Sequence, residues 1–350
     1  HYIFCLIIFS ITCFGKEFDE LFTIYEPIDS TSKIEKSINN SFNTMIYRLT
    51  GESSPSNIWK IINAGNARKD FIKSYSIKNI NNDSYLQVFF DKDLLIKKFN
   101  ELSISALGNS RPSVLFLINI DNGSLKPYTL KNSESNSEID YLIKNSLKNL
   151  SNSRAIFLEL PELDLSDIDI LSSYSKLINS NDFLNSKYDS SEVIEINITK
   201  VGINDWQING DIAFDYNDND FNNYFIEKFQ RYVVNIIDQL LDKNIIETSK
   251  ETITNINISN INNYDDYIKS KEKISNLVST KNVDISSFEF NKISYKVDIY
   301  GDFDTFVNEV SGINFMNTIE TNYSNQTLEL DFIRWVNILY LYLTCYQLLE

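Results

Sequence analysis

Along this chain, hydrophobic positions recur with the period of a helix in some segments and with the period of a strand in others. Between these segments lies one uninterrupted apolar run. Ser113–Ile120 comes directly after a turn at Asn109–Pro112, and such a run is typical of a strand covered on both faces. Pro112 lacks a backbone N–H and restricts the residue before it, so the strand can begin only after Pro112. We therefore place the start of a new structural unit at Asn109.

The residues before this strand predict an N-terminal α+β domain over residues 16–108. Apolar residues at helical spacing predict a helix over Ser32–Thr50, which Gly51 ends. The other expected elements are a strand at Leu21–Ile28, a helix at Ile58–Ala64, a hairpin of Phe71–Lys78 and Ser84–Phe90, and a helix that begins at Asp91. The expected order is β-α-α-β-β-α.

Strands and helices alternate in the next part, which predicts a central α/β domain with a mixed sheet over residues 109–247. Its expected strands are Ser113–Ile120, Leu125–Leu130, Arg154–Leu160, Glu192–Val201 and Trp206–Phe214. Its expected helices are Ile139–Leu150, one capped by Ser166, Tyr174–Leu184 and Asp220–Lys243.

A third unit over residues 248–334 has the order β-α-β-β-α-β, which fits a ferredoxin-like domain. The expected elements are Thr252–Ile258, Asn263–Val278, Asn282–Phe290, Lys292–Tyr300 and Phe303–Val310, with Phe315–Ile319 and Thr327–Phe332 closing the unit. The expected fold class is thus α+β and α/β, in several domains. An apolar tail over residues 335–350 is shorter than the roughly twenty residues that span a bilayer. It can be a docking helix, a membrane-touching tail or sequence foreign to the fold.

The first fifteen residues have the pattern of a signal peptide. Tyr2–Phe14 is an apolar run, and cleavage near Gly15 would start the mature chain at Lys16. No start methionine or basic segment precedes the run, so we expect the signal peptide, residues 1–15, to be truncated at its start. Lipid attachment at Cys13 and a buried first element are the alternatives. We expect export to the periplasm, with no transmembrane span in the mature chain.

Charge and rare residues exclude several classes of function. The 350 residues carry a net charge of −16, which repels nucleic acids. His1 is the only histidine and Cys345 the only cysteine after the signal peptide, so Ser-His-Asp, Cys-His and histidine–metal chemistry are excluded. Asp215–Asp220 imitates half of a calcium loop, but Asp220 stands where glycine is required. We expect no enzyme activity, no cofactor and no bound metal.

The turn before the central strand carries a family resemblance. Leu107-Gly108-Asn109-Ser110-Arg111-Pro112 resembles the Arg-Pro junction of the proteobacterial family known as domain of unknown function 2066. Segments in the same order and spacing also resemble that family: Leu21–Ile28, Tyr47–Gly51, Leu160–Asp167, and Lys187–Asp189 with Trp206. The chain departs from it at Asp189-Ser190, where the family has Gly-Ala. The resemblance implies an exported envelope protein with no assigned activity. The architecture is more loosely similar to flagellar assembly protein T and to the N-terminal domain of the Tol-system propeller protein.

Three arginines are candidates for binding, because few of the basic residues in this Lys-rich chain are arginine. They are Arg48, Arg111 and Arg154, and the planar guanidinium suits a bidentate pair with a carboxylate. A structural ion pair is the alternative to ligand binding.

Asp164 and Asp167 belong to the densest acidic cluster, with Glu159, Glu162 and Asp169. Paired carboxylates can act as acid and base or hold a hard cation. The alternative is a solvated loop whose aspartates cap the next helix. No histidine or lysine lies near this loop in the sequence.

We therefore expect a non-enzymatic envelope protein that binds an envelope or assembly partner. Its candidate binding residues are Arg48, Arg111, Asp164, Asp167 and Tyr188. One alternative is a carboxylate-based hydrolase or metal-dependent enzyme that uses the Asp164–Asp169 loop. Another is a periplasmic sensor of small ligands, with a pocket between the first two units.

Overall fold

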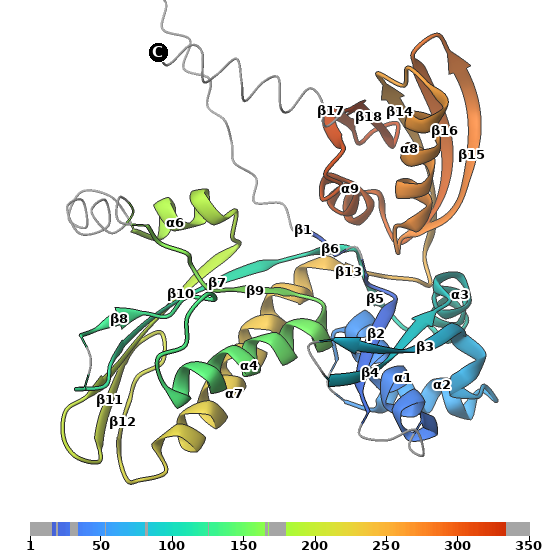
Figure 1. Ribbon diagram of the computed structural model, residues 1–350. Coiled ribbons are helices and arrows are strands. Elements are labelled where there is room, and N and C mark those ends of the chain that lie inside the picture. The colour runs from blue at the N-terminus through green and yellow to red at the C-terminus, as the bar shows by residue number, and fades with distance from the viewer. Residues whose placement is uncertain are drawn as a thin grey trace, which may run out of the picture.

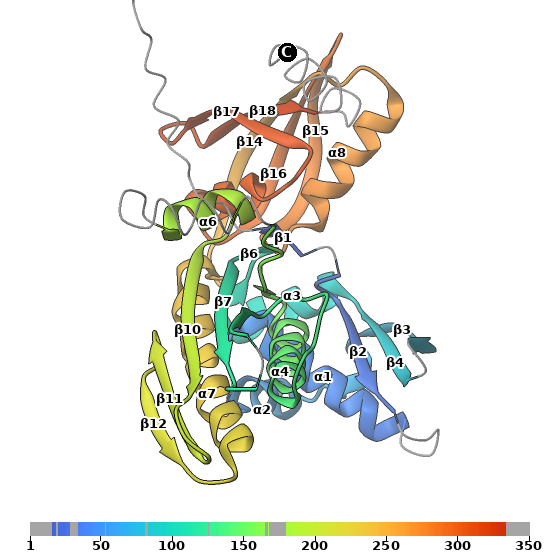
Figure 2. The ribbon, with the colours of Figure 1, turned by 60° about the vertical axis from the view of Figure 1, so that its left-hand side comes forward.

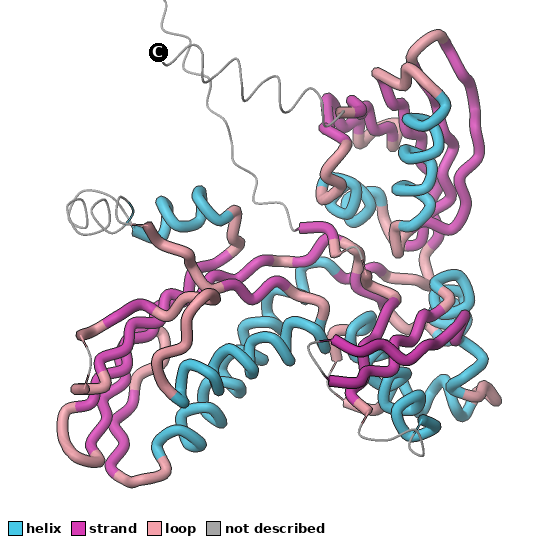
Figure 3. Tube along the Cα trace, in the orientation of Figure 1, coloured by secondary structure: helices cyan, strands magenta, loops and turns pink. Residues whose placement is uncertain are grey.

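The computed structural model describes residues 16–333, apart from residues 19, 29–33, 53, 81–82, 125, 165–166 and 168–179. These residues form a mixed α/β protein with several separate sheets (Figures 1 and 3). The expected signal peptide, most of the helix after Ser166 and the apolar tail lie outside the described residues.

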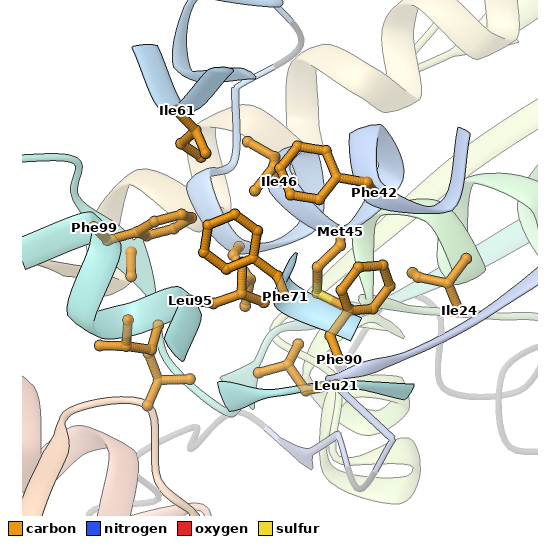
Figure 4. Packing of buried hydrophobic residues seen from close by; sticks show 14 of the residues in the cluster. Leu21, Ile24, Phe42, Met45, Ile46, Ile61, Phe71, Phe90, Leu95 and Phe99 are labelled. Atoms are coloured by element: carbon orange, nitrogen blue, oxygen red, sulfur yellow. The ribbon is translucent and has the colours of Figure 1, made fainter. Parts of the chain in front are cut away.

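The first part of the chain places a three-stranded antiparallel sheet, in the order β2-β4-β3, against helices. Its elements are β2 (Thr23–Pro27), α1 (Ile34–Thr50), α2 (Ser56–Asn63), η2 (Arg68–Phe71), β3 (Ile72–Ile80), β4 (Asp83–Phe90) and α3 (Lys92–Leu102). Phe42, Met45 and Ile46 of α1 share one helix face and are fully buried. They meet Phe71 and Phe99 in the core that Figure 4 shows. The element order agrees with the one that the sequence predicts.

The central part has a six-stranded sheet in the order β12-β11-β10-β7-β8, with β9 also paired to β7. Its elements are β7 (Ser113–Asp121), β8 (Tyr128–Thr129), α4 (Glu138–Arg154), β9 (Phe157–Glu159), α6 (Ser180–Tyr188), β10 (Glu192–Lys200), β11 (Asp205–Gly210), β12 (Phe214–Asn217) and α7 (Phe221–Leu241). β10 and β9 run parallel to β7. Helices α4 and α7 cover one face of this sheet (Figure 1).

Both faces of β7 are covered by described residues as far as Leu117. Leu115 packs against Leu163, Leu184 and Val193 on the face opposite α4 and α7, and the half-buried Leu117 packs against the same cluster. Beyond Leu117 this face carries Asn119, which donates a hydrogen bond to Asn197 of β10.

The segment expected as one strand over Trp206–Phe214 is instead two strands, β11 and β12. The break follows Gly210, whose φ is +110° and which lies against the backbone of Glu195. The stretch Asp215–Asp220 that imitates half of a calcium loop begins as a strand, because Asp215 pairs with Gln207 in the β11–β12 ladder.

The last part has a five-stranded sheet in the order β15-β16-β14-β18-β17. Its elements are β14 (Glu251–Ser259), α8 (Tyr264–Asn276), β15 (Thr280–Glu289), β16 (Lys292–Tyr300), α9 (Phe303–Ser311), β17 (Met316–Asn322) and β18 (Thr327–Phe332). Ile274 of α8 and Phe306 of α9 are buried with Val297 in one core. β18 runs parallel to β14 and antiparallel to β17.

Short elements gather where the three parts meet. They are β1 (Lys16–Glu17), β5 (Ala106–Leu107), β6 (Ser110–Arg111), η3 (Asp242–Asn244) and β13 (Ile245–Ile246). β1 pairs with β6, and β13 pairs with β5. Figure 2 shows β1 and β6 below the last part of the chain and above β7 and β2. The stretch 106–111 is therefore a meeting point, which we call the junction.

Candidate functional site

Arg111 lies at the centre of the junction and is fully buried, at 0% exposure. Its Nη2 donates to the carbonyl oxygens of Arg48, at 3.2 Å, and of Leu107, at 3.4 Å. Burial lowers the pKa of Arg111 to about 9, and the neighbouring cation of Arg48 adds to this effect. Among the described residues no carboxylate forms an ion pair with Arg111, so it binds carbonyl oxygens where a carboxylate partner was expected.

Arg48, at the C-terminal end of α1, also binds carbonyl oxygens. Its Nη1 donates to Glu20, Leu21 and Thr23 at 3.2, 3.0 and 2.7 Å, and its Nη2 donates to Asn152 of α4. Burial lowers the pKa of Arg48 to about 10, with Glu20 opposing the shift. Arg48 therefore ties the turn before β2 to α4.

Arg154 is the member of this group that has a carboxylate partner. It donates to the carbonyl oxygen of Gly51 at 2.6 Å and forms an ion pair with Asp238 of α7. This pair brings together the ends of α1 and α4 and the last turns of α7. The structure thus brings Arg48, Arg111 and Arg154 together. Their hydrogen bonds connect the first part of the chain to the central part.

Glu309 of α9 joins the last part of the chain to the same junction. Its buried carboxylate accepts hydrogen bonds from the backbone N–H groups of Asn109, Val278 and Ser279, at 2.7, 2.9 and 3.0 Å, and from the Ser279 hydroxyl. A Cβ on Gly108 would lie 3.0 Å from this carboxylate. Sequence reasoning missed Glu309. The sequence carries one signal of its burial: Glu309 lies next to Val310, on the side of a short predicted helix that carries the apolar residues.

The first two described residues also contact the central and last parts of the chain. Lys16 Nζ lies 3.2 Å from the Glu159 carboxylate and donates to the carbonyl oxygen of Tyr188 at 3.1 Å. Glu17 forms an ion pair of 2.9 Å with Lys273 of α8. These residues pair with β6, so β1 links the junction to the β9 edge of the central sheet and to the last part.

The acidic loop has a local structure of its own. Asp164 accepts from the Asp167 N–H at 2.9 Å, and Asp167 accepts from the Asp164 N–H at 2.8 Å. Asp167 also forms an ion pair with Lys187 at the end of α6. The expectation of no lysine partner is therefore wrong, because folding brings α6 beside the loop. Burial raises the pKa of the neighbouring Tyr188. Within the described residues, no group of three or more acidic, histidine or cysteine side chains is placed to hold a metal.

A cavity of about 280 Å³ opens between the first and central parts. It is bounded by the ends of α1 and α7, by α2 and by residues 103–107. Gly51, Asn57 and Asp238 line it, so the Arg154–Asp238 pair forms part of its wall.

No family model, no curated protein and no solved structure matches the chain. The family resemblance therefore rests on the motifs quoted above. Among the helices that the structure describes, none combines the length and the apolar character that crossing a membrane requires.

Proposed function

We propose that this protein is an exported, non-enzymatic envelope protein that binds a partner through its edge strand β3. The observation that carries the proposal is a pair of apolar side chains on that strand, Tyr75 and Ile77, which are 54% and 48% exposed. The family resemblance and the expected signal peptide support the envelope location.

The position of these two side chains follows from strand register. Tyr75 pairs with Val88 and Ile77 pairs with Leu86, and paired residues of an antiparallel ladder share a face. Val88 and Leu86 are fully buried in the first core. Tyr75 and Ile77 therefore continue the apolar face of the sheet beyond the part that its helices cover.

The same strand leaves backbone groups available. Among the strands that the structure describes, β3 pairs with β4 alone, and an unpaired edge of this kind accepts an added strand. Lys73 and Lys78 are the charged residues of β3, in a chain of net charge −16. We infer that the partner supplies an extended segment with apolar and acidic residues.

The charged residues with the most internal contacts have a structural role rather than a catalytic one. Arg48, Arg111 and Glu309 bind backbone atoms at the junction. Asp164 and Asp167 cap each other's backbone, and Asp167 pairs with Lys187. These contacts favour binding over the hydrolase alternative, which requires carboxylates that are free to react.

We further infer three domains, over residues 16–108, 109–247 and 248–334. Each apolar cluster draws most of its members from one of these ranges, although Ala155, Ile246, Val278 and Tyr300 join the first cluster and Leu107 joins the second. The third domain resembles a ferredoxin-like unit in the neighbours β15-β16-β14. It departs from that pattern at β18, which lies beside β14 and runs parallel to it, and at β17, which takes the edge of the sheet.

The test is capture of periplasmic proteins by the mature chain, followed by hydrogen exchange of the purified complex. We expect wild type to retain an envelope protein that protects the amides of residues 73–79. Ile77→Lys should lose this protein. Ile285→Lys is a matched control, because Ile285 is 49% exposed on the edge strand β15 and pairs with buried Tyr295. Equal capture by both variants, or no protection of β3, would overturn the proposal.

A further inference from the structure

The cavity between the first and central parts has the features of a binding site for a small molecule. The C-terminal ends of α1 and α7 both border it, through Gly51 and Leu241. The last carbonyl groups of a helix carry partial negative charge. Two helix ends of this kind favour a cation in the space between them.

Asn57 gives an independent sign of a ligand. This residue is only 4% exposed, and its side chain lines the cavity. Its side-chain amide has no hydrogen bond to the described residues, and its oxygen and nitrogen are open to the cavity rather than fully covered. A polar group on a bound molecule would supply the missing partner.

Most charged side chains that line the cavity are negative, which is also the sign of the partial charge at the two helix ends. Asp238 and Asp242 lie four residues apart at the end of α7, and Glu52 lies at the end of α1. Asp238 is paired with Arg154, whereas Asp242 has no ion pair among the described residues. Lys60 is the one basic residue among the described residues that line the cavity.

The rest of the wall is mixed, with the hydroxyl residues Thr50, Ser103 and Ser105 beside an apolar part. Ile104, Leu107 and Leu241 are buried and border the cavity. A volume of about 280 Å³ lies just below the usual range of ligand pockets and suits a small ligand. A ligand that matches this wall has a short hydrocarbon body.

We propose that this cavity binds a small organic amine. Its ammonium group lies near Asp242 and Glu52, a polar group or the ammonium itself bonds the Asn57 amide oxygen, and its hydrocarbon part contacts Leu107 and Leu241. This site is separate from β3, so the inference does not depend on the proposed partner binding.

Calorimetric titration of the mature protein with 1-aminobutane tests the proposal, with 1-butanol and butyrate as neutral and anionic probes of the same size. We expect the amine to bind and the other two probes not to bind. Asp242→Asn should weaken binding about two- to fivefold, as the loss of one exposed charge contact predicts. Asp304→Asn, which changes an exposed aspartate of α9, is the matched control and should bind like wild type.

A second variant separates the Asn57 contribution. Asn57→Leu keeps the number of side-chain heavy atoms and removes the amide, so it should weaken amine binding while the protein remains folded. Absence of amine binding, binding of butyrate at equal strength, or equal affinity in Asp242→Asn and Asp304→Asn would overturn the inference.

Discussion

The Glu309 carboxylate accepts a hydrogen bond from the backbone N–H of Asn109, 200 residues earlier in the chain. The same carboxylate accepts from Val278 and Ser279. One acidic side chain of α9 therefore holds the start of the central part and the end of α8 together. The apolar strand β7 begins directly beyond this point.

Removal of the Glu309 carboxylate should destabilise the protein strongly. Glu309→Ala leaves buried N–H groups without an acceptor, and we expect a loss of about 3 kcal/mol in the free energy of unfolding. Urea denaturation followed by circular dichroism measures this loss. Glu320→Ala, which changes an exposed acid of β17, should change it by less than about 0.5 kcal/mol. Equal effects of the two variants would contradict the role of Glu309.

Removal of β1 should loosen the last part of the chain. A variant that begins at Phe18 lacks the Glu17–Lys273 ion pair and the β1–β6 ladder. We expect a lower melting temperature and faster hydrogen exchange in α8 than in the chain that begins at Lys16. Glu17→Gln in the longer chain separates the ion pair from the ladder and should show a smaller change. Unchanged exchange in α8 after the deletion would show that β1 does not hold this part.

Gly210 should tolerate no side chain. A Cβ at this position would lie 2.2 Å from the carbonyl oxygen of Glu195, and the φ of +110° is strained for other residues. We expect Gly210→Ala to cost about 3 kcal/mol in the free energy of unfolding. The control is Gly123→Ala, at φ +71° with no atom within 4 Å of the added Cβ, which should cost about 1 kcal/mol. Denaturant titration compares the two, and the reverse order of costs would be inconsistent with the structure.

Glu26 should make stability depend on pH. Burial raises the pKa of Glu26, and the Asn40 hydrogen bond only partly opposes the shift. The folded protein therefore binds this proton more tightly than the unfolded chain, so the stability contributed by Glu26 falls as the pH rises above 4.5, its ordinary pKa. We expect Glu26→Gln to stabilise the protein at pH 7 by less than about 1 kcal/mol and to lose this advantage near pH 4.

Melting temperatures at the two pH values check the Glu26 prediction. Glu35→Gln, which changes an exposed acid in the first turn of α1, is the control. A constant difference between Glu26→Gln and wild type across this range would contradict the assignment.

The elements of this fold could be predicted from sequence where the pattern is local. Apolar residues at helical spacing predict that α1 is a helix, because it buries one side. The continuous apolar run predicts that β7 is a strand, because it buries residues on both sides. The Gly51 end of α1 and the Asp91 start of α3 also agree with expectation. The break after Gly210 was missed, because a close approach between two backbones leaves little trace in local patterning.

The junction could be predicted only in part. Arg48 and Arg111 were selected because arginine is rare in this chain, and they do meet. Their partners are carbonyl oxygens, which every residue offers, so sequence cannot identify them. Lys187 joins Asp167 and Lys273 joins Glu17 through contacts that span 20 and 256 residues. Charge pairs at such separations depend on the completed fold.

Site-specific photo-crosslinking in the native periplasm tests the central claim most directly. A photoreactive residue at position 77 of β3 is compared with one at position 285 of β15, since both replace half-exposed isoleucines on edge strands. We predict a crosslink from position 77 to an extended, acidic segment of one envelope protein, and none to that protein from position 285. No crosslink at position 77, or the same products from both positions, would contradict partner binding through β3.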